Sequence, residues 1–272
     1  MTTFDLNAVE ANLVGTPFAG RLQHFASVTS TNSLALEAAQ TGERSGVWVA
    51  DEQTAGRGRG GHGWHSIAGD GLYVSVLMTP PIALPITQAL WLSLATGLAA
   101  QVAIHAASGL KADIRWPNDL LLNNRKCGGI LVETAVSPAE GQQPAALRYA
   151  VIGIGINVNH AEFPDGIAAI ATSLFRESGR PVSRETLLAA LLLNLHEQIT
   201  LLVREHQNAG GNDGLLERFA RASSWVQGKH VRVDEAGGYT GVTAGLDARG
   251  FLRVAGDDGV QHTVLSGGVR QK

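Results

Sequence analysis

The stretch ADEQTAGRGRGGHGWH, residues 50–65, lies between two short apolar segments, 47–49 and 72–78, that are typical of buried strands. Five of its residues are glycines, and Arg57 and Arg59 stand among them. Glycine permits positive φ and lets a backbone come close to a ligand, while consecutive N–H groups and arginines suit an anion. The stretch therefore predicts a loop that grips a phosphate or a carboxylate. A flexible surface linker is the alternative, which the strands at both ends of the loop disfavour.

The composition is that of an ordinary globular protein of 272 residues, with 44% hydrophobic and 17% charged residues. This length favours a large domain with a small one, or two comparable domains. A net charge of −3 gives no global reason to expect nucleic acid as a partner. The single cysteine, Cys127, excludes an intramolecular disulfide, and residues 1–12 lack the apolar core of a signal peptide. We therefore expect a cytoplasmic protein.

Residues 71–110 contain no Asp, Glu, Lys or Arg, so they could be mistaken for a membrane span. Pro80, Pro81 and Pro85 interrupt the segment, and polar residues recur after them. A spanning helix needs about 20 predominantly apolar residues without interruption. We therefore expect a buried strand followed by a core helix over 87–108, and no membrane association.

The remaining pattern predicts an α+β fold, in which a mixed β-sheet is packed with helices. A short leader helix is expected before residue 22, and Ser30–Ser33 are capping residues that start a helix. Two further helices are expected over 183–206 and 215–222. We expect strands over residues 22–25, 46–50, 72–78, 113–116, 120–122, 130–136 and 148–159.

The pattern changes after Trp225 to short strands separated by glycine turns. Such a pattern predicts a small β-barrel-like module. We therefore divide the chain into a catalytic domain over residues 1–222 and a β domain over residues 223–272. The strands expected in the β domain are 230–233, 240–246, 251–254 and 261–265.

Common nucleotide fingerprints do not explain the glycine loop. Gly56-x-Gly58-x-x-Gly61 matches the dinucleotide pattern, but no amphipathic helix and no suitably placed acidic residue follow it. A Walker A loop is missing, since Gly228-Lys229 is followed by histidine. Neither a Rossmann nor a P-loop enzyme is supported.

A second group of residues carries chemistry of its own. Asn118 and Asp119, in a proline turn, can offer oxygen atoms to Mg²⁺, which usually arrives with phosphates. Lys126 stands beside two glycines, and the 153–157 strand contains two more, which indicates close approach of a ligand or a backbone. Alone, Lys126 is typical of a solvated charge at a hairpin end. Together with the arginine loop, these residues predict a site for ATP and a divalent ion.

Four motifs are similar to those of biotin–protein ligases and occur in that family's order and spacing. They are Gly56–Trp64, Arg115–Asp119, Lys126–Glu133 and Gly153–Asn157, with Ser30–Asn32 upstream. The similarity is strong over residues 27–160. It implies a class II synthetase-like catalytic domain and a C-terminal SH3-like β-barrel, as in ligases without an N-terminal DNA-binding domain.

The resemblance implies a two-step reaction. ATP and Mg²⁺ activate biotin as biotinyl-5′-AMP, and a lysine of a biotin carboxyl carrier domain, such as that of acetyl-CoA carboxylase, then accepts the biotin. DNA is not expected as a partner, and formation of a homodimer is left open.

The resemblance also implies residue roles. Lys126, Arg57 and Arg59 would be catalytic, and Asp119 would bind Mg²⁺. Biotin would contact Ser30, Thr31, Asn32, Gln53, Gly56, Arg57, Gly58, Arg59, Trp64, Lys126, Gly129, Gly153 and Gly155. ATP would contact Arg59, Trp64, Asn118, Lys126 and Asn157.

The chain departs from the family pattern at three positions. Gly60 and His62 stand where arginines are frequent, and Arg115 stands where lysine is frequent. The loss of charge at 60 and 62 could make the loop more mobile or change nucleotide affinity, and we expect the loop to be disordered until ligand arrives. A lipoate–protein ligase, a biotin-responsive repressor and a non-catalytic binding module are the alternatives. The Gly-Arg-Gly-Arg run favours biotin, and the near-neutral charge disfavours the repressor.

Overall fold

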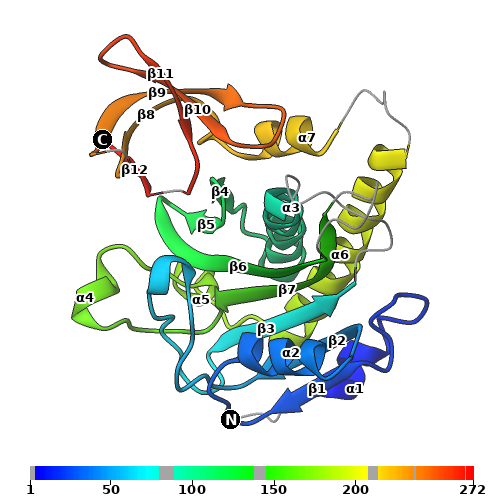
Figure 1. Ribbon diagram of the computed structural model, residues 1–272. Coiled ribbons are helices and arrows are strands. Elements are labelled where there is room, and N and C mark those ends of the chain that lie inside the picture. The colour runs from blue at the N-terminus through cyan, green and yellow to red at the C-terminus, as the bar shows by residue number, and fades with distance from the viewer. Residues whose placement is uncertain (1–3, 80–88, 138–144, 208–213, 236, 267) are drawn as a thin grey trace.

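The computed structural model describes residues 4–79, 89–137, 145–207, 214–235, 237–266 and 268–272 (Figure 1). A 7-stranded sheet has the strand order β1-β2-β3-β7-β6-β5-β4, in which β1 and β2 are parallel and the other pairs are antiparallel. Its strands are β1 (Leu22–Phe25), β2 (Ser45–Ala50), β3 (Gly71–Met78), β4 (Asp113–Arg115), β5 (Asp119–Leu122), β6 (Arg125–Ser137) and β7 (Ala146–Asn157).

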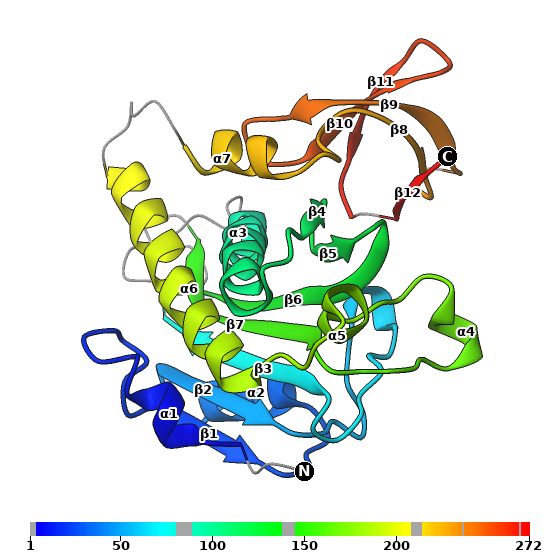
Figure 2. The ribbon, with the colours of Figure 1, turned by 180° about the vertical axis from the view of Figure 1, so that it is seen from behind.

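Helices cover both faces of this sheet. The helices are α1 (Leu6–Glu10), α2 (Thr31–Gln40), α3 (Ala89–Ser108), α4 (Asp165–Ala168), α5 (Leu174–Ser178), α6 (Arg184–Gln207) and α7 (Leu215–Ala222). Helix α2 covers one face, where Ala35 and Ala39 pack with Trp48 and Leu77. Helices α3 and α6 pack on the other face and against each other (Figure 2). The predicted mixed sheet packed with helices is therefore confirmed.

Helices α3 and α6 are both long and apolar enough to cross a membrane by length and composition alone. Helix α3 is apolar on all sides, and its residues from Leu92 to Ala100 are buried between the sheet and its neighbouring helices. A helix that is hydrophobic all round suits such a buried position. The prediction of a core helix is confirmed, and its expected start at residues 87 and 88 lies outside the described residues.

A second, 5-stranded antiparallel sheet has the strand order β11-β10-β9-β8-β12 (Figure 1). It follows α7 in the chain, and its strand β9 contacts that helix. Trp116 connects it to the first domain by donating its indole N–H to the Gly250 carbonyl at 2.9 Å. The sheet's last strand was not among the expected ones, because only three residues form it. Its strands are β8 (Gln227–Val233), β9 (Tyr239–Leu246), β10 (Leu252–Gly256), β11 (Gln261–Val264) and β12 (Val269–Gln271).

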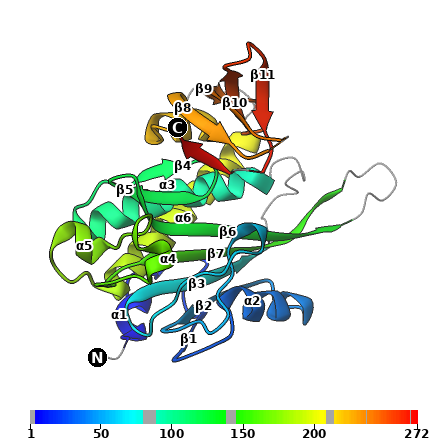
Figure 3. The same cartoon turned by 90° about the vertical axis from the view of Figure 1, so that its left-hand side faces the viewer.

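The central hairpin of β6 and β7 is longer than the sequence pattern predicts. Asn123 and Asn124 form the two-residue turn that joins β5 to β6, and both have positive φ. Strand β6 therefore begins directly after them, at Arg125, rather than at the expected residue 130. Towards the other end, both strands continue past β5 and project from the molecule (Figure 3). The edge of β6 beyond Gly129 is therefore free of a β5 partner, and it forms a wall of the site described below.

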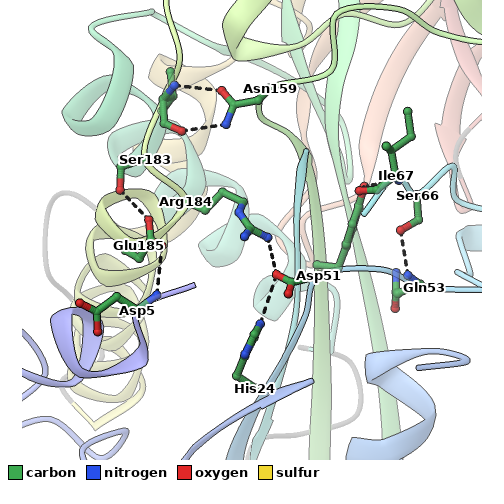
Figure 4. Close-up of polar contacts among 12 residues, drawn as sticks. Asp5, His24, Asp51, Gln53, Ser66, Ile67, Asn159, Ser183, Arg184 and Glu185 are labelled. Carbon is green, nitrogen blue, oxygen red and sulfur yellow. Dashed lines mark hydrogen bonds and ion pairs between the residues drawn. The ribbon is translucent and has the colours of Figure 1, made fainter. Parts of the chain in front are cut away.

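An ion pair fastens helix α6 to the end of β2. Arg184 Nη1 lies 2.7 Å from Asp51 Oδ1, and His24 Nε2 of β1 lies 3.2 Å from the same oxygen (Figure 4). The Arg184 side chain is 9% exposed, and its guanidinium lies 5.2 Å from the centre of the Phe4 ring. Asp51 is the first residue after β2, where the chain leaves the sheet to form the glycine loop. This contact therefore fixes the start of that loop.

We expect Arg184→Ala to lower the free energy of unfolding by about 2–3 kcal/mol, because it leaves the Asp51 carboxylate without its buried cation. Urea denaturation followed by circular dichroism measures the loss. Arg21→Ala, which removes an exposed arginine, is the matched control and should change stability by less than about 0.5 kcal/mol. Equal effects of the two substitutions would contradict the anchoring role of Arg184.

Candidate active site

Two cavities lie beside the central strands of the large sheet, and residues of the glycine loop line both. The outer cavity, of about 560 Å³, is lined by residues 56–63 of the loop, 130–134 of β6, Ala89, Leu90, Ser93 and Pro117. The inner cavity, of about 50 Å³, is lined by Thr31, Gln53, Arg57, Gly58, Arg59, Trp64, Val74, Asn118, Lys126, Gly129, Ile130, Leu131, Gly153, Ile154 and Gly155. The structure thus brings together segments that lie more than 100 residues apart in the sequence.

A buried row of polar side chains lies at the base of the inner cavity. Ser75, in the middle of β3, donates its hydroxyl hydrogen to Asn32 Oδ1 at 2.5 Å, and its oxygen lies 2.8 Å from Thr31 Oγ1. Ser75 is fully buried, and Thr31 and Asn32 are nearly so. Ser30 is the N-cap residue of α2, but its side chain makes no capping hydrogen bond. Simple capping therefore does not explain this polar cluster.

Gln53 extends the row toward the loop. Its side-chain oxygen accepts from the Thr31 backbone N–H at 2.9 Å and from the Thr31 hydroxyl at 3.1 Å. Its own backbone N–H donates to Ser66 Oγ at 2.8 Å (Figure 4). Since the amide oxygen is engaged, the Gln53 amide NH₂ is the group left to donate to a ligand in the inner cavity.

Glu133 of β6 connects this row to the arginine loop. One of its oxygens, Oε2, accepts from Asn32 Nδ2 at 2.8 Å and from Arg57 Nη2 at 2.6 Å. Sequence reasoning gave no role to Glu133 or to Ser75. A signal for Ser75 was present, since it is a polar residue within the apolar segment 72–78. Glu133 offered no comparable signal, because an exposed charged residue is common on a strand at the edge of a sheet.

Glycines in β6 and β7 make room for side chains rather than only for a ligand. A Cβ at Gly153 would lie 2.1 Å from Asn32 Oδ1, and one at Gly155 would lie 2.6 Å from the Trp64 ring. The Trp64 indole therefore lies flat against the strand, 5.5 Å from Lys126 Nζ. Its N–H is buried and has no hydrogen-bond partner among the described residues.

Asp119 holds the second group of charges. Its two oxygens lie 2.5 Å from Lys126 Nζ and 2.5 Å from Arg115 Nη2. Burial by itself would raise the pKa of Asp119, but the two cations outweigh it and hold the pKa below its ordinary value. Arg115, present where the family often has lysine, makes a two-nitrogen contact with Asp119 that a lysine could not make. The carboxylate therefore fixes Lys126 at the wall of the inner cavity.

The loop itself is folded and tied down at both arginines. Arg59 donates to Asn118 Oδ1 at 2.9 Å and to the Ser266 carbonyl of the β domain at 2.6 Å. Burial lowers the pKa of Arg59, and the nearby carboxylates of Asp119 and Glu235 oppose that shift. Gly60 has φ +64°, a left-handed conformation that favours glycine over the family's arginine. The interpretation as a flexible linker is therefore wrong.

The other predicted site residues differ in position. Asn157 lies at the end of β7, where its amide donates to the Thr172 carbonyl at 3.0 Å, and it lines neither cavity. Ser30 and Asp119 line neither cavity directly. Within the part of the chain that the structure describes, no group of three or more His, Cys, Asp or Glu residues could hold a metal ion. A metal here would therefore need ligands from outside the protein.

Comparison with known proteins agrees with this geometry. A model of the biotin/lipoate A/B protein ligase family matches residues 24–157. The chain is 34% identical to the bifunctional ligase/repressor BirA of Bacillus spizizenii over 238 residues, which are 86% of this chain and 69% of the relative. It is 33% identical to the biotin–[acetyl-CoA-carboxylase] ligase of Mycobacterium tuberculosis over 272 residues, 97% of this chain and 94% of the relative.

A solved structure, the biotin protein ligase from Aquifex aeolicus in complex with biotin and ATP, superposes with a TM-score of 0.75. Its sequence is 27% identical, and the match covers 93% of this chain and all of that one. The similarity therefore extends over both sheets of the structure.

We expect Ser75→Ala to lower the free energy of unfolding by about 1–3 kcal/mol, because it leaves the buried Asn32 Oδ1 without a donor. Thermal and urea denaturation measure the change. Ser27→Ala removes an exposed hydroxyl that contacts Glu52 at 3.2 Å, and this control should cost a few tenths of a kcal/mol. A Ser75→Ala protein as stable as the control would refute the buried polar row.

Proposed function

The chain belongs to the biotin/lipoate A/B protein ligase family and is a biotin–protein ligase, and we propose that its inner cavity binds biotin and its outer cavity binds ATP. One observation supports this assignment above the others. Lys126, Arg57 and Arg59 all line the inner cavity, while the loop that carries both arginines also lines the outer one. A carboxylate in the inner cavity and a phosphate in the outer one would share these cations.

The polar row suits the biotin end of the proposed ligand pair. A cyclic urea presents one carbonyl acceptor and two N–H donors, and it needs matching groups once it is out of water. The Gln53 amide NH₂ can donate to the carbonyl, and the Thr31 hydroxyl, which lines the cavity, can rotate to accept or donate. Val74 and Ile154 supply apolar contacts for the thiophane ring and its alkyl tail.

The cations carry the chemistry of the first proposed step. A biotin carboxylate oxygen attacks the α-phosphorus of ATP, an O–P bond forms, and the bond to pyrophosphate breaks. The carboxylate and the triphosphate repel each other, so the positive charges of Lys126, Arg57 and Arg59 hold them within attack distance and stabilise the charge that develops on the phosphate oxygens. Ion pairs of Lys126 and Arg57 with carboxylates hold these groups in place before ligand arrives.

The second proposed step transfers biotin to protein. The neutral ε-amine of a carrier lysine attacks the acyl carbon, an amide C–N bond forms, AMP leaves with the C–O electron pair, and the ammonium proton passes to solvent. We propose that the acceptor is a biotin carboxyl carrier domain, as the name of the Mycobacterium tuberculosis relative suggests. A cytoplasmic location, inferred from the single cysteine, is part of the same proposal.

Magnesium is also proposed, with Asp119 as its protein ligand. Mg²⁺ commonly binds one or two carboxylates and completes its shell with phosphates and water. Asp119 is a single carboxylate whose two oxygens contact Arg115 and Lys126, so one of these contacts would have to loosen. The residues therefore fit an ion that arrives with the nucleotide, where it would neutralise phosphate charge.

Closed as it is, the loop leaves too little space for biotin. The inner cavity of about 50 Å³ is far below the roughly 300 Å³ or more that small-molecule pockets commonly have. The Arg57–Glu133 and Arg59–Asn118 contacts hold the loop over it. Entry of biotin therefore requires that these contacts open and that the loop closes again over the ligand.

The direct test combines the chain with biotin, ATP, Mg²⁺ and a purified carrier domain, and follows the carrier by intact-protein mass spectrometry. One added biotinyl group per carrier is expected, and its absence would refute the proposed acceptor. Calorimetric titration with biotin and with lipoate separates the two acids. Tighter binding of lipoate would contradict the assignment of the inner cavity.

Lys126→Ala should lower the rate of ATP- and biotin-dependent pyrophosphate release by about 100-fold or more, the usual loss when one stabilising cation or donor is removed. A coupled pyrophosphate assay at saturating substrates measures it. Lys111→Ala, an exposed lysine remote from both cavities, should retain the wild-type rate. Near-normal pyrophosphate release by Lys126→Ala would show that this residue has no role in the first step.

Glu133→Gln should speed the escape of activated biotin about three- to tenfold, because it keeps an acceptor for Asn32 but removes the charge that holds Arg57. The release rate is measured by trapping free adenylate after rapid dilution. Glu43→Gln, an exposed acidic residue, is the control. Unchanged or slower escape from Glu133→Gln would contradict the role of Glu133 in loop closure.

A further inference from the structure

A separate cavity lies at the ends of strands β2 and β3 that are opposite to the glycine loop. This distal cavity, of about 520 Å³, is lined by Pro17, Phe18, Arg44, Ser45, Leu77, Met78, Thr79, Leu195, His196, Ile199, Thr200, Val203, Arg204 and Gln207. It lies between the start of β2, the end of β3 and the C-terminal half of α6. Neither the biotin nor the ATP assignment above uses any of these residues.

Its walls are apolar. Phe18 and Leu195 are buried, while Met78, Ile199 and Val203 are partly exposed and complete the apolar lining. The volume falls within the range of about 300–1,000 Å³ that is usual for small-molecule sites. A cavity of this size with such walls suits an apolar body that would otherwise be exposed to water.

Among the described residues that line the distal cavity, the charged ones are all basic. Arg44 and Arg204 are exposed lining residues, and the ring of His196, also in the lining, lies edge-on to Phe18 with 6.5 Å between the ring centres. No Asp or Glu is among the described residues that line it. Neither arginine forms an ion pair with a described residue, although Arg57, Arg115, Arg125, Arg184, Arg218 and Arg249 do so elsewhere.

We propose that the distal cavity binds an alkyl monocarboxylate of medium chain length. The alkyl chain lies among Phe18, Met78 and Val203, and the carboxylate faces Arg44 and Arg204. Charge complementarity selects this class over neutral apolar molecules, because two guanidiniums that form no ion pair with a described residue favour an anion and can form two-point contacts with a carboxylate. The apolar walls in turn disfavour small polar anions, which gain nothing from burial there.

The position of the distal cavity also relates it to the catalytic site. Met78 and Ser75 are on the same strand, three residues apart, which is about 10 Å at 3.3–3.4 Å per residue. Ser75 is the donor at the base of the inner cavity. The two sites therefore share β3, but no residue belongs to both linings.

Met78 provides a local probe of occupancy. The chain contains two methionines, Met1 and Met78, so methyl-¹³C-methionine labelling gives two signals. Decanoate added below its micelle concentration should shift the Met78 signal saturably, while the Met1 signal serves as the reference. Calorimetry on the same samples gives the dissociation constant. No saturable shift of Met78 up to millimolar decanoate would overturn the proposal.

Variants separate the carboxylate contact from the apolar one. The double substitution Arg44→Ala and Arg204→Ala should weaken decanoate binding at least tenfold, while binding of decanol, which lacks the charge, should change less than twofold. Replacing both by lysine should restore much of the affinity. Val203→Trp, which fills the cavity, should weaken both ligands. Decanoate binding unaffected by either change would place the ligand elsewhere and refute the site.

Controls keep this test independent of folding and of the ligase reaction. Arg44 and Arg204 are exposed, so their removal should shift the melting temperature little. Arg148→Ala, an exposed arginine outside the cavity, should bind decanoate as the wild type does. Equal loss of affinity in Arg148→Ala and the double variant would show a general charge effect and overturn the proposed site. The assay contains neither biotin nor ATP, so its failure and failure of the ligase assignment are distinguishable.

Discussion

Gly129 and Gly155 face each other across β6 and β7, and the absence of side chains at this pair shapes the site. A Cβ would meet the Trp64 ring at 3.0 Å from Gly129 and at 2.6 Å from Gly155. Either side chain would lift the indole from the sheet. Trp64 ends the glycine loop, so the loop could not close over the cavities in its present position. Gly153 makes the corresponding room for Asn32, which anchors the polar row.

Two carboxylates organise the cations Arg57 and Lys126 around that surface. Glu133 accepts from Arg57 and Asn32, and Asp119 contacts Lys126 together with Arg115. These pairs are partly buried, so each carboxylate offsets positive charge that would otherwise be costly to gather in one place. An incoming carboxylate or phosphate can compete for the same cations. An exchange of ion-pair partners would thus couple ligand binding to rearrangement of the loop.

A structural feature could be predicted from the sequence where a local pattern of residues specifies it. Long periodic helices such as Arg184–Gln207 and the turn at Asn123 and Asn124 were predictable, because the apolar pattern and the left-handed asparagines are local properties. The short helices α4 and α5 were not predicted, since 4 and 5 residues are too few to show a period. The loop was expected to be disordered, yet contacts from distant strands and the β domain hold it folded.

The sequence by itself determined the family, the glycine positions and the residue types that can bind biotin and ATP, because these are carried by motifs within a few residues of each other. Only the tertiary structure decided the partner of each group. It placed Ser75 beneath Thr31 and Asn32, paired Glu133 with Arg57, and joined Arg59 to the Ser266 carbonyl 207 residues away. Such contacts depend on strand register and domain packing, which bring distant residues within hydrogen-bond distance and leave no local pattern in the chain.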